Sequence, residues 1–278
     1  MQTGAPWLFF FVFILMIGNW TIEAFKWRSM ISKIEHVKLS RSLEAVFSGL
    51  TISFFTPNRI GEYAGRVFHL QHGKRMQATL ITVIENSSQL IVTVVTGCIA
   101  SILYLNDYMD VNPVFMILYR ILLASFAVIS VLLYFNLDLF EKFFLRFKLS
   151  EYWRQIFHVF ALYSSADLLK VLLLSCLRYF VFTLQFIILL KVYGCNFPFL
   201  TSMLMIAMTF FVISVVPTFA ITEITVRGLV STYFFGKLTI DTLPVLNAAF
   251  SLWLINLVLP AVAGAIFIFH FRFDKNHR

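Results

Sequence analysis

Charged residues are scarce in this sequence. Only 13% of its 278 residues are charged, whereas 60% are hydrophobic and 33 are phenylalanine. A water-soluble domain cannot hide that much apolar surface, because its exterior must be polar enough to keep it dispersed. Several windows of about 20 residues carry no charge, which is long enough for a helix to cross ~30 Å of hydrocarbon. The composition therefore predicts an all-α integral membrane protein that crosses the bilayer several times.

Motifs of metal, nucleotide and nucleophile chemistry are also missing. Cys98, Cys176 and Cys195 form no CxxC pattern, so they predict neither a disulfide framework nor a metal site. There is no Walker sequence, no HExxH and no nucleophile elbow. We therefore expect no cofactor and no metal, and a transporter is favoured over an enzyme. The net charge of +8 lies in short segments between apolar windows, which is typical of cytoplasmic loops facing anionic lipid heads and argues against nucleic acid as a partner.

The apolar windows predict five spans, and the charges between them predict the orientation. The spans are expected at 5–22, 77–105, 113–135, 168–193 and 243–270, and a further apolar window lies at 198–216. Basic segments 23–41 and 136–158 and the basic C-terminal tail are placed in the cytoplasm, and 106–112, with Asp107 and Asp110, outside. Segment 136–158, in which Lys142, Arg146, Lys148 and Arg154 alternate with Phe and Leu, resembles an interfacial amphipathic helix. The expected location is the plasma (inner) membrane, with the C-terminus cytoplasmic.

Two segments must begin and end on the same side of the membrane in this topology. Residues 42–75 start and finish in the cytoplasm, and residues 198–240 start and finish outside. Each is predicted to be a re-entrant or broken hairpin, although the second is also compatible with two complete crossings. Two opposed broken segments in corresponding positions are the signature of an inverted-repeat transporter. We expect one membrane domain over 1–278, with a first repeat at about 5–105, a linker span and interfacial helix at 113–158, and a second repeat at about 165–270.

The two breaks carry the same charge pattern. Pro57 is followed by Glu62 and then by Arg66 four residues later. Pro217 is followed by Glu223 and then by Arg227, again four residues later. Proline ends a helix, and glutamate and arginine at i and i+4 share one face of the resumed helix and can pair. A single pair of this kind is an ordinary helix salt bridge, but two at matching positions in membrane hairpins indicate a pathway or binding site. We expect the two breaks to meet and form a polar cavity.

Two other polar positions inside spans are candidates for the same cavity. Glu85 shares a helix face with Gln89 and is expected to point away from lipid, either to line the cavity or to hydrogen-bond a neighbouring helix. Arg178 shares a face with Gln185 and is expected to hold a lipid phosphate or one of the paired glutamates. Asn256, in the last span, is expected to serve in helix packing.

The stretch P-N-R-I-G-E-x-x-x-R, with the later T-E-x-x-x-R-G and the upstream NWTIEAFKWRSMI, resembles the membrane domain of the lysylphosphatidylglycerol synthase/flippase family. The resemblance implies a domain that moves lipids with polar heads between leaflets. The site that it implies comprises Pro57, Arg59, Gly61, Glu62 and Arg66, with Glu223 and Arg227 opposite. Many relatives have a glycine-rich second break with arginine just before glutamate, so the identity of the substrate does not transfer. The aminoacyl-transferase domain of bifunctional members is expected to be absent, since the chain ends eight residues after His270.

Three functions remain open at this level. The first is a flippase or transporter for a phospholipid or another lipid with a charged head, working beside a separate lipid-modifying enzyme. The second is a membrane enzyme acting on a lipid carrier, and the third is a small-solute transporter, which a cavity closed to lipid on every side would favour. For the first, we expect Arg59 and the free N–H groups of the helix resuming near Ile60 to bind phosphate, and Glu62 to select the head group.

Overall fold

The computed structural model describes residues 6–109, 112–147 and 150–275, and these residues form helices joined by short turns, with no strand among them. Five helical segments are long and apolar enough to cross a membrane. They are α1 (Pro6–Ile31), α4 (Arg75–Tyr108), α5 (Pro113–Phe135), α8 (Ser165–Val192), and α11 (Leu243–Trp253), which continues through a π-helical turn (Leu254–Val258) into α12 (Leu259–Lys275). The predicted all-α polytopic membrane protein with five spans is confirmed.

The two segments with prolines are each divided into two helices. The first contains α2 (Leu39–Phe54), a 3-10 turn (Pro57–Arg59) and α3 (Gly61–Val67). The second contains α9 (Phe199–Val215) and α10 (Ala220–Phe235), with Pro217 between them. The entering helix ends three residues before Pro57 in the first segment and two residues before Pro217 in the second, because the residue ahead of a proline is driven out of the helical region. The relation of the two segments by an inverted repeat, and their entry from opposite faces, stay predictions.

The first span is longer than its uncharged window suggests. We expected residues 23–41 to be a cytoplasmic connection, but α1 runs on to Ile31 and buries both Glu23 and Lys26. Together with Asn19 and Trp27, these side chains recur every three or four residues and therefore lie on one face of the helix. Charge did not end this helix, because partners from other helices neutralise it.

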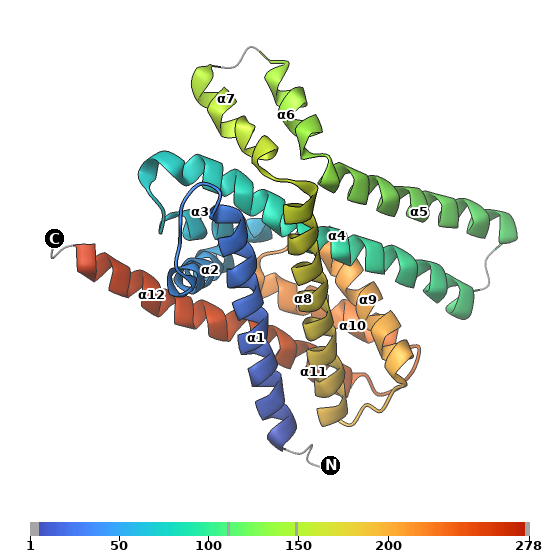
Figure 1. Cartoon of the computed structure of the whole chain (residues 1–278). Helices are drawn as coiled ribbons and strands as arrows, with labels where there is room; N and C mark the ends of the chain where they lie inside the picture. The colour runs from blue at the N-terminus through green and yellow to red at the C-terminus, as the bar shows by residue number, and fades with distance from the viewer. Residues whose placement is uncertain (1–5, 110–111, 148–149, 276–278) are drawn as a thin grey trace.

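Segment 136–158 forms two short helices rather than the expected single interfacial helix. α6 (Leu137–Leu145) and α7 (Glu151–Phe157) form a hairpin that projects from the bundle between α5 and α8 (Figure 1). A 3-10 turn (His158–Leu162) follows α7, and another (His72–Lys74) precedes α4. The rings of Phe144 and Phe157 stack with centroids 4.3 Å apart and join the two arms. One long helix would have separated these rings, so their stacking requires two separate helices.

Glycines set the close packing of the first broken segment. A Cβ at Gly65 would lie 2.5 Å from Cα of Gly49, and one at Gly61 would lie 2.7 Å from the carbonyl oxygen of Ile52. α3 therefore folds back along α2 with the backbones almost touching. This contact gives a packing reason for Gly61, and its expected place in the binding site stays a prediction.

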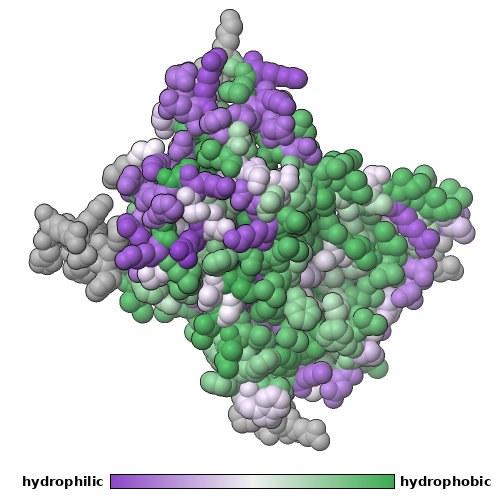
Figure 2. Space-filling model, viewed as in Figure 1, coloured by the Kyte–Doolittle hydropathy of each residue, from purple (hydrophilic) through white to green (hydrophobic). Residues whose placement is uncertain are grey.

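The bundle is organised around α1 and α8, which pack side by side through its middle, while α2 packs on α12 and α4 on α9 (Figure 1). Hydrophobic side chains cover much of the face seen in Figure 2, and hydrophilic ones gather over the α6–α7 hairpin. α5 contacts mainly α4 and buries little of its own surface. Asp110 and Lys148, which entered the orientation argument, lie outside the described residues, as does Arg278 of the basic C-terminal tail. The orientation itself stays a prediction.

Candidate functional site

The two helix breaks contact each other directly, as expected. The backbone N–H of Asn58 donates to the carbonyl oxygen of Thr218 at 2.9 Å, and the N–H of Thr218 donates to Oδ1 of Asn58 at 3.2 Å. Each residue directly follows its proline, Pro57 or Pro217. The reciprocal pair thus joins equivalent points of the two breaks, which are 160 residues apart in the chain.

Charged side chains join the breaks a second time. The Nη2 atom of Arg59 donates to both carboxylate oxygens of Glu223, at 3.0 and 2.8 Å, and Nη2 of Arg227 donates to Oε1 of Glu223 at 2.7 Å. We call Arg59, Glu223 and Arg227 the break triad. Its side chains are 38%, 6% and 14% exposed, respectively. With two positive charges and one negative, the triad carries a net charge of +1.

The backbone that presents Arg59 is strained. Asn58 has φ of 50° and Arg59 has φ of 57°, and among the described residues these are the non-glycine positions with positive φ. A single residue in this left-handed region is tolerable for asparagine, but two in succession, one of them an arginine, cost of order 1–3 kcal/mol each. The contacts of Asn58 with Thr218 and of Arg59 with Glu223 hold this conformation in place.

A cavity of about 550 Å³ lies beside the triad. Its wall combines charged, amide, aromatic and aliphatic side chains from α1, α4, α8, α9, α10 and the last span. The residues that carry its chemistry are Trp20, Asn58, Arg59, Gln89, Arg178, Glu223, Arg227, Trp253 and Asn256. This volume lies in the ordinary range for a small-molecule site, and its mixture of an apolar wall with few charges is typical of such sites.

Several buried polar atoms on the cavity wall have no hydrogen-bond partner among the described residues. Two are donors, Nε1 of Trp20 and Nε of Arg227, and two are acceptors, Oε1 of Gln89 and Oδ1 of Asn256. Asn256 lies in the π-helical turn, a distortion that is frequent at functional sites. Because an unpaired buried polar atom is costly, a polar ligand or water in the cavity accounts best for these four.

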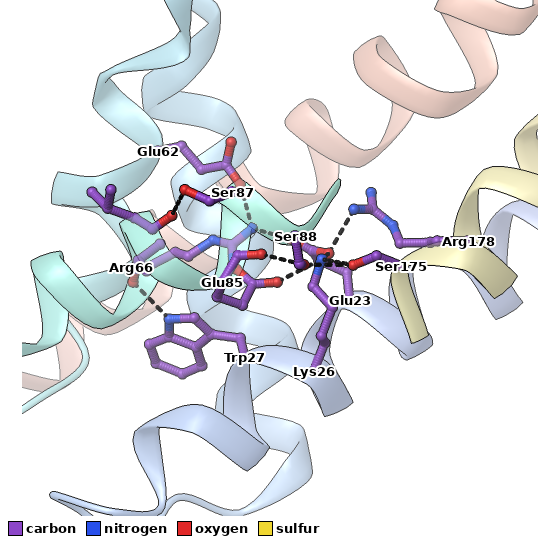
Figure 3. Close-up of polar contacts among 12 residues, drawn as sticks. Glu23, Lys26, Trp27, Glu62, Arg66, Glu85, Ser87, Ser88, Ser175 and Arg178 are labelled. Carbon is purple, nitrogen blue, oxygen red and sulfur yellow. Dashed lines mark hydrogen bonds and ion pairs between the residues drawn. The ribbon is translucent and has the colours of Figure 1, made fainter. Parts of the chain in front are cut away.

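A second group of charges lies next to the cavity, deep in the bundle (Figure 3). Arg66 is completely buried and pairs with Glu23 at 2.5 Å, with Glu85 at 2.9 Å, and with Glu62. Lys26 is also completely buried, and its Nζ lies 2.8 Å from Glu85 and 3.1 Å from Glu23. Figure 3 shows these side chains converging from α1, α3 and α4 on one point.

Arg178 completes this group and links it to the cavity. From α8 it donates to Oε2 of Glu23 at 2.5 Å and to Oδ1 of Asn19 at 2.9 Å, and it also lies on the cavity wall. Its guanidinium group sits 5.0 Å from the ring centroid of Trp20. We call Glu23, Lys26, Glu62, Arg66, Glu85 and Arg178 the buried ionic cluster. Three negative and three positive charges make this cluster neutral.

The predicted site residues divide between these two groups. Arg59, Arg178, Glu223 and Arg227 line the cavity, whereas Glu62, Arg66 and Glu85 belong to the cluster and do not. The two predicted i, i+4 pairs both form, but Arg59, not Arg66, makes the charged contact between the breaks.

The start of α3 offers no free N–H at Gly61 for the expected anion site, so binding of phosphate there stays a prediction that rests on Arg59. The N–H of Gly61 donates to Oγ1 of Thr56 at 2.8 Å, so it is already occupied. α3 has only seven residues, and neither Gly61 nor Glu62 reaches the cavity wall.

Sequence reasoning missed several residues of both groups. Glu23 and Lys26 were assigned to a loop, and Asn58, Thr218 and Trp20 were not considered for the cavity. Their helical spacing was the available signal for Glu23 and Lys26, since it places them on the face of Asn19 and Trp27. Asn256, expected in helix packing, donates to the backbone of Leu252 but also presents its free oxygen to the cavity.

The described cavity wall has no histidine, cysteine or lysine, and its carboxylate, Glu223, is held by Arg59 and Arg227. Among the described residues, no group of three or more His, Cys, Asp or Glu side chains is arranged to hold a metal ion. The polar groups that the cavity offers are guanidinium, amide, indole, hydroxyl and carboxylate groups.

Comparisons with known proteins place the first part of the chain in a family. No curated protein and no solved structure matches the sequence. The family described as "Lysylphosphatidylglycerol synthase TM region" matches residues 1–166, which include α1 to α7 and most of the buried ionic cluster. The second break, with Glu223 and Arg227, lies outside the match. Because the match covers more than half of the residues, the chain belongs to this family of integral membrane proteins related to lipid handling.

Proposed function

We propose that this protein moves a phospholipid, or another lipid with a charged head, between the two leaflets of the plasma membrane. The observation that carries the proposal is the cavity at the junction of the two breaks, with its surplus positive charge in an apolar bundle. Charges at membrane depth are costly, and they usually mark a substrate path.

The edge of the cavity favours a lipid over a small solute. Val215 and Val216 belong to its wall and are also 70% and 37% exposed, so an apolar part of the wall continues onto the apolar exterior. A head group can enter the cavity there while its acyl chains stay in the hydrocarbon. A small-solute transporter needs no such apolar edge. A membrane enzyme needs an activated nucleophile or a base, whereas the carboxylate of the wall, Glu223, is held by two arginines. A separate enzyme would then supply or modify the lipid.

Proteoliposomes containing a phospholipid with a fluorescent head group test the proposal. Transport is read as the fraction of label protected from a membrane-impermeant quencher. Arg59→Gln and Arg227→Gln each remove a charge-assisted hydrogen bond, so we expect translocation to slow about ten- to hundredfold. Arg146→Gln is the matched control, because Arg146 is exposed on the α6–α7 hairpin, away from the cavity.

Equal translocation by all three variants would refute the role of the break triad. No translocation by the parent protein for any phospholipid tested would refute the function itself. A parallel assay with an entrapped soluble anion separates lipid transport from small-solute transport.

A further inference from the structure

We propose that the carboxylate of Glu223 occupies the place on Arg59 that the anionic head group of the substrate takes when it binds. In this structure Glu223 pairs with Arg59 and so holds the two breaks together. A head group with one net negative charge takes Arg59 from it, and this exchange separates the breaks. The inference rests on the proposed function, since it names the charge class of the head group and the movement that its binding triggers.

The geometry identifies Arg59 as the group that changes partner. Its side chain is the most exposed of the break triad, and it reaches Glu223 through Nη2 alone. Glu223 keeps a second partner, Arg227, at 2.7 Å on its own helix. When Arg59 leaves, Glu223 therefore remains paired, whereas the loss of Arg227 would leave it tied only to the other break. Exchange at Arg59 avoids an unpaired buried carboxylate.

Charge balance selects the ligand. The triad sums to +1, since Arg59 and Arg227 contribute +2 and Glu223 contributes −1. With one bound phosphodiester the net charge of the triad and ligand is zero. With a zwitterionic head group it stays at +1, and with a dianion it becomes −1. A neutral sum is favoured in a site of low dielectric constant, where unbalanced charge is costly. Glu223, with 5% of its surface exposed, already shows how an anionic oxygen pair fits against Arg59.

The backbone explains why the exchange would move the breaks apart. Asn58 and Arg59 both have positive φ, and the contacts that hold them there are those made with Thr218 and Glu223. Removing the Arg59–Glu223 contact leaves the Asn58–Thr218 pair as the hydrogen bonds that tie the turn to the other break, while inside the turn the N–H of Ile60 still donates to the carbonyl oxygen of Pro57 at 3.2 Å. Strain at such positions persists only while neighbouring contacts enforce it. The loaded site therefore favours relaxation of the 57–59 turn away from Thr218.

Disulfide trapping between the breaks tests the exchange. Asn58→Cys and Thr218→Cys are introduced after Cys98, Cys176 and Cys195 have been replaced by serine. The rate of cross-linking under mild oxidation is measured in nanodiscs of phosphatidylcholine and in nanodiscs containing phosphatidylglycerol, which has one net negative charge. We expect the anionic lipid to slow cross-linking at least about fivefold, the lower end of ordinary coupling between two sites. Soluble glycerophosphoglycerol, a phosphodiester with one negative charge, in phosphatidylcholine nanodiscs is the third arm.

Two controls make the result specific. Ser88→Cys with Ser175→Cys joins α4 to α8 where the native hydroxyl oxygens are 2.6 Å apart, and its cross-linking should not depend on the lipid. Glu223→Gln, added to the Asn58/Thr218 cysteine pair, should slow cross-linking even in phosphatidylcholine, because the neutral amide holds Arg59 less strongly.

The outcomes separate this inference from the proposed function. Equal cross-linking in the two lipids, or fast cross-linking after Glu223→Gln, overturns the exchange even if translocation is observed. Cross-linking slowed by glycerophosphoglycerol as strongly as by the anionic lipid supports the exchange but identifies a soluble anion as the ligand. Slowing by the lipid alone, in a protein that does not translocate it, supports the exchange and refutes the flippase.

Discussion

Replacing Arg66 by methionine should destabilise the protein strongly. The arginine is completely buried and pairs with three carboxylates, those of Glu23, Glu62 and Glu85. Its loss leaves the buried ionic cluster with three negative charges and two positive ones. Removing one partner of a buried ion pair typically costs about 3–5 kcal/mol, which lowers the ratio of folded to unfolded protein by a factor of roughly 10² to 10⁴. The double variant Arg66→Met/Glu85→Gln restores neutrality and should recover part of this loss.

Buried cysteine thiols of the protein allow its unfolding to be measured. The thiols of Cys98 and Cys195 are buried, whereas Cys176 is exposed and is first replaced by serine. A maleimide fluorophore then reads unfolding in detergent as the buried thiols become reactive. Arg146→Met, an exposed position on the α6–α7 hairpin, is the control for the loss of an arginine. If Arg66→Met melts with the parent, or if the double variant is no more stable than Arg66→Met, charge balance does not hold the cluster together.

Two further changes test the packing around the site. His69 lies outside the five spans and is 4% exposed, and burial together with Arg41 lowers its pKa to about 4. A histidine in the unfolded chain takes up its proton near pH 6.5, whereas His69 in the folded protein resists protonation down to about pH 4. The stability that neutral His69 contributes is therefore complete above pH 6.5 and is lost as the pH falls from about 6.5 to 4. His69→Asn should flatten this part of a profile of melting temperature against pH. Gly264→Ala should lower the melting temperature, because the new Cβ would lie 2.1 Å from the carbonyl oxygen of Phe47 on α2, whereas Gly18→Ala, with nothing within 4 Å, should leave it unchanged or slightly raised.

The breaks were predictable because their causes are local. Pro57 and Pro217 end helices through their own rings, and the spacing of Glu62 to Arg66 and of Glu223 to Arg227 fixes a shared helix face. The five spans were predictable from the length of the uncharged windows. The ends of most windows lie within a few residues of the helix ends, but α1 ends at Ile31, nine residues after the end of its window at residue 22.

The partners across the bundle were not predictable. Arg59 and Arg66 both follow the first proline. Their spacing does not predict that Arg66 pairs with Glu23 while Arg59 pairs with Glu223. That choice depends on α3 lying almost backbone to backbone on α2, which the small residues Gly49 and Gly65 permit. A single sequence shows which residues face one side of a helix but not which helix lies opposite.

The buried ionic cluster and the break triad differ in net charge, and this difference suits the cluster to stabilising the fold and the triad to binding an anion. The buried ionic cluster is neutral and its arginine and lysine near the centre are fully buried, so it can exist at membrane depth without a ligand. The break triad has one uncompensated positive charge and keeps Arg59 partly exposed beside the cavity. An anion completes the second group but would unbalance the first. Arg178 is paired with Glu23 and also lies on the cavity wall, so we expect it to position the two groups relative to each other. We also expect the net charge of each group, rather than its number of arginines, to decide where a head group binds.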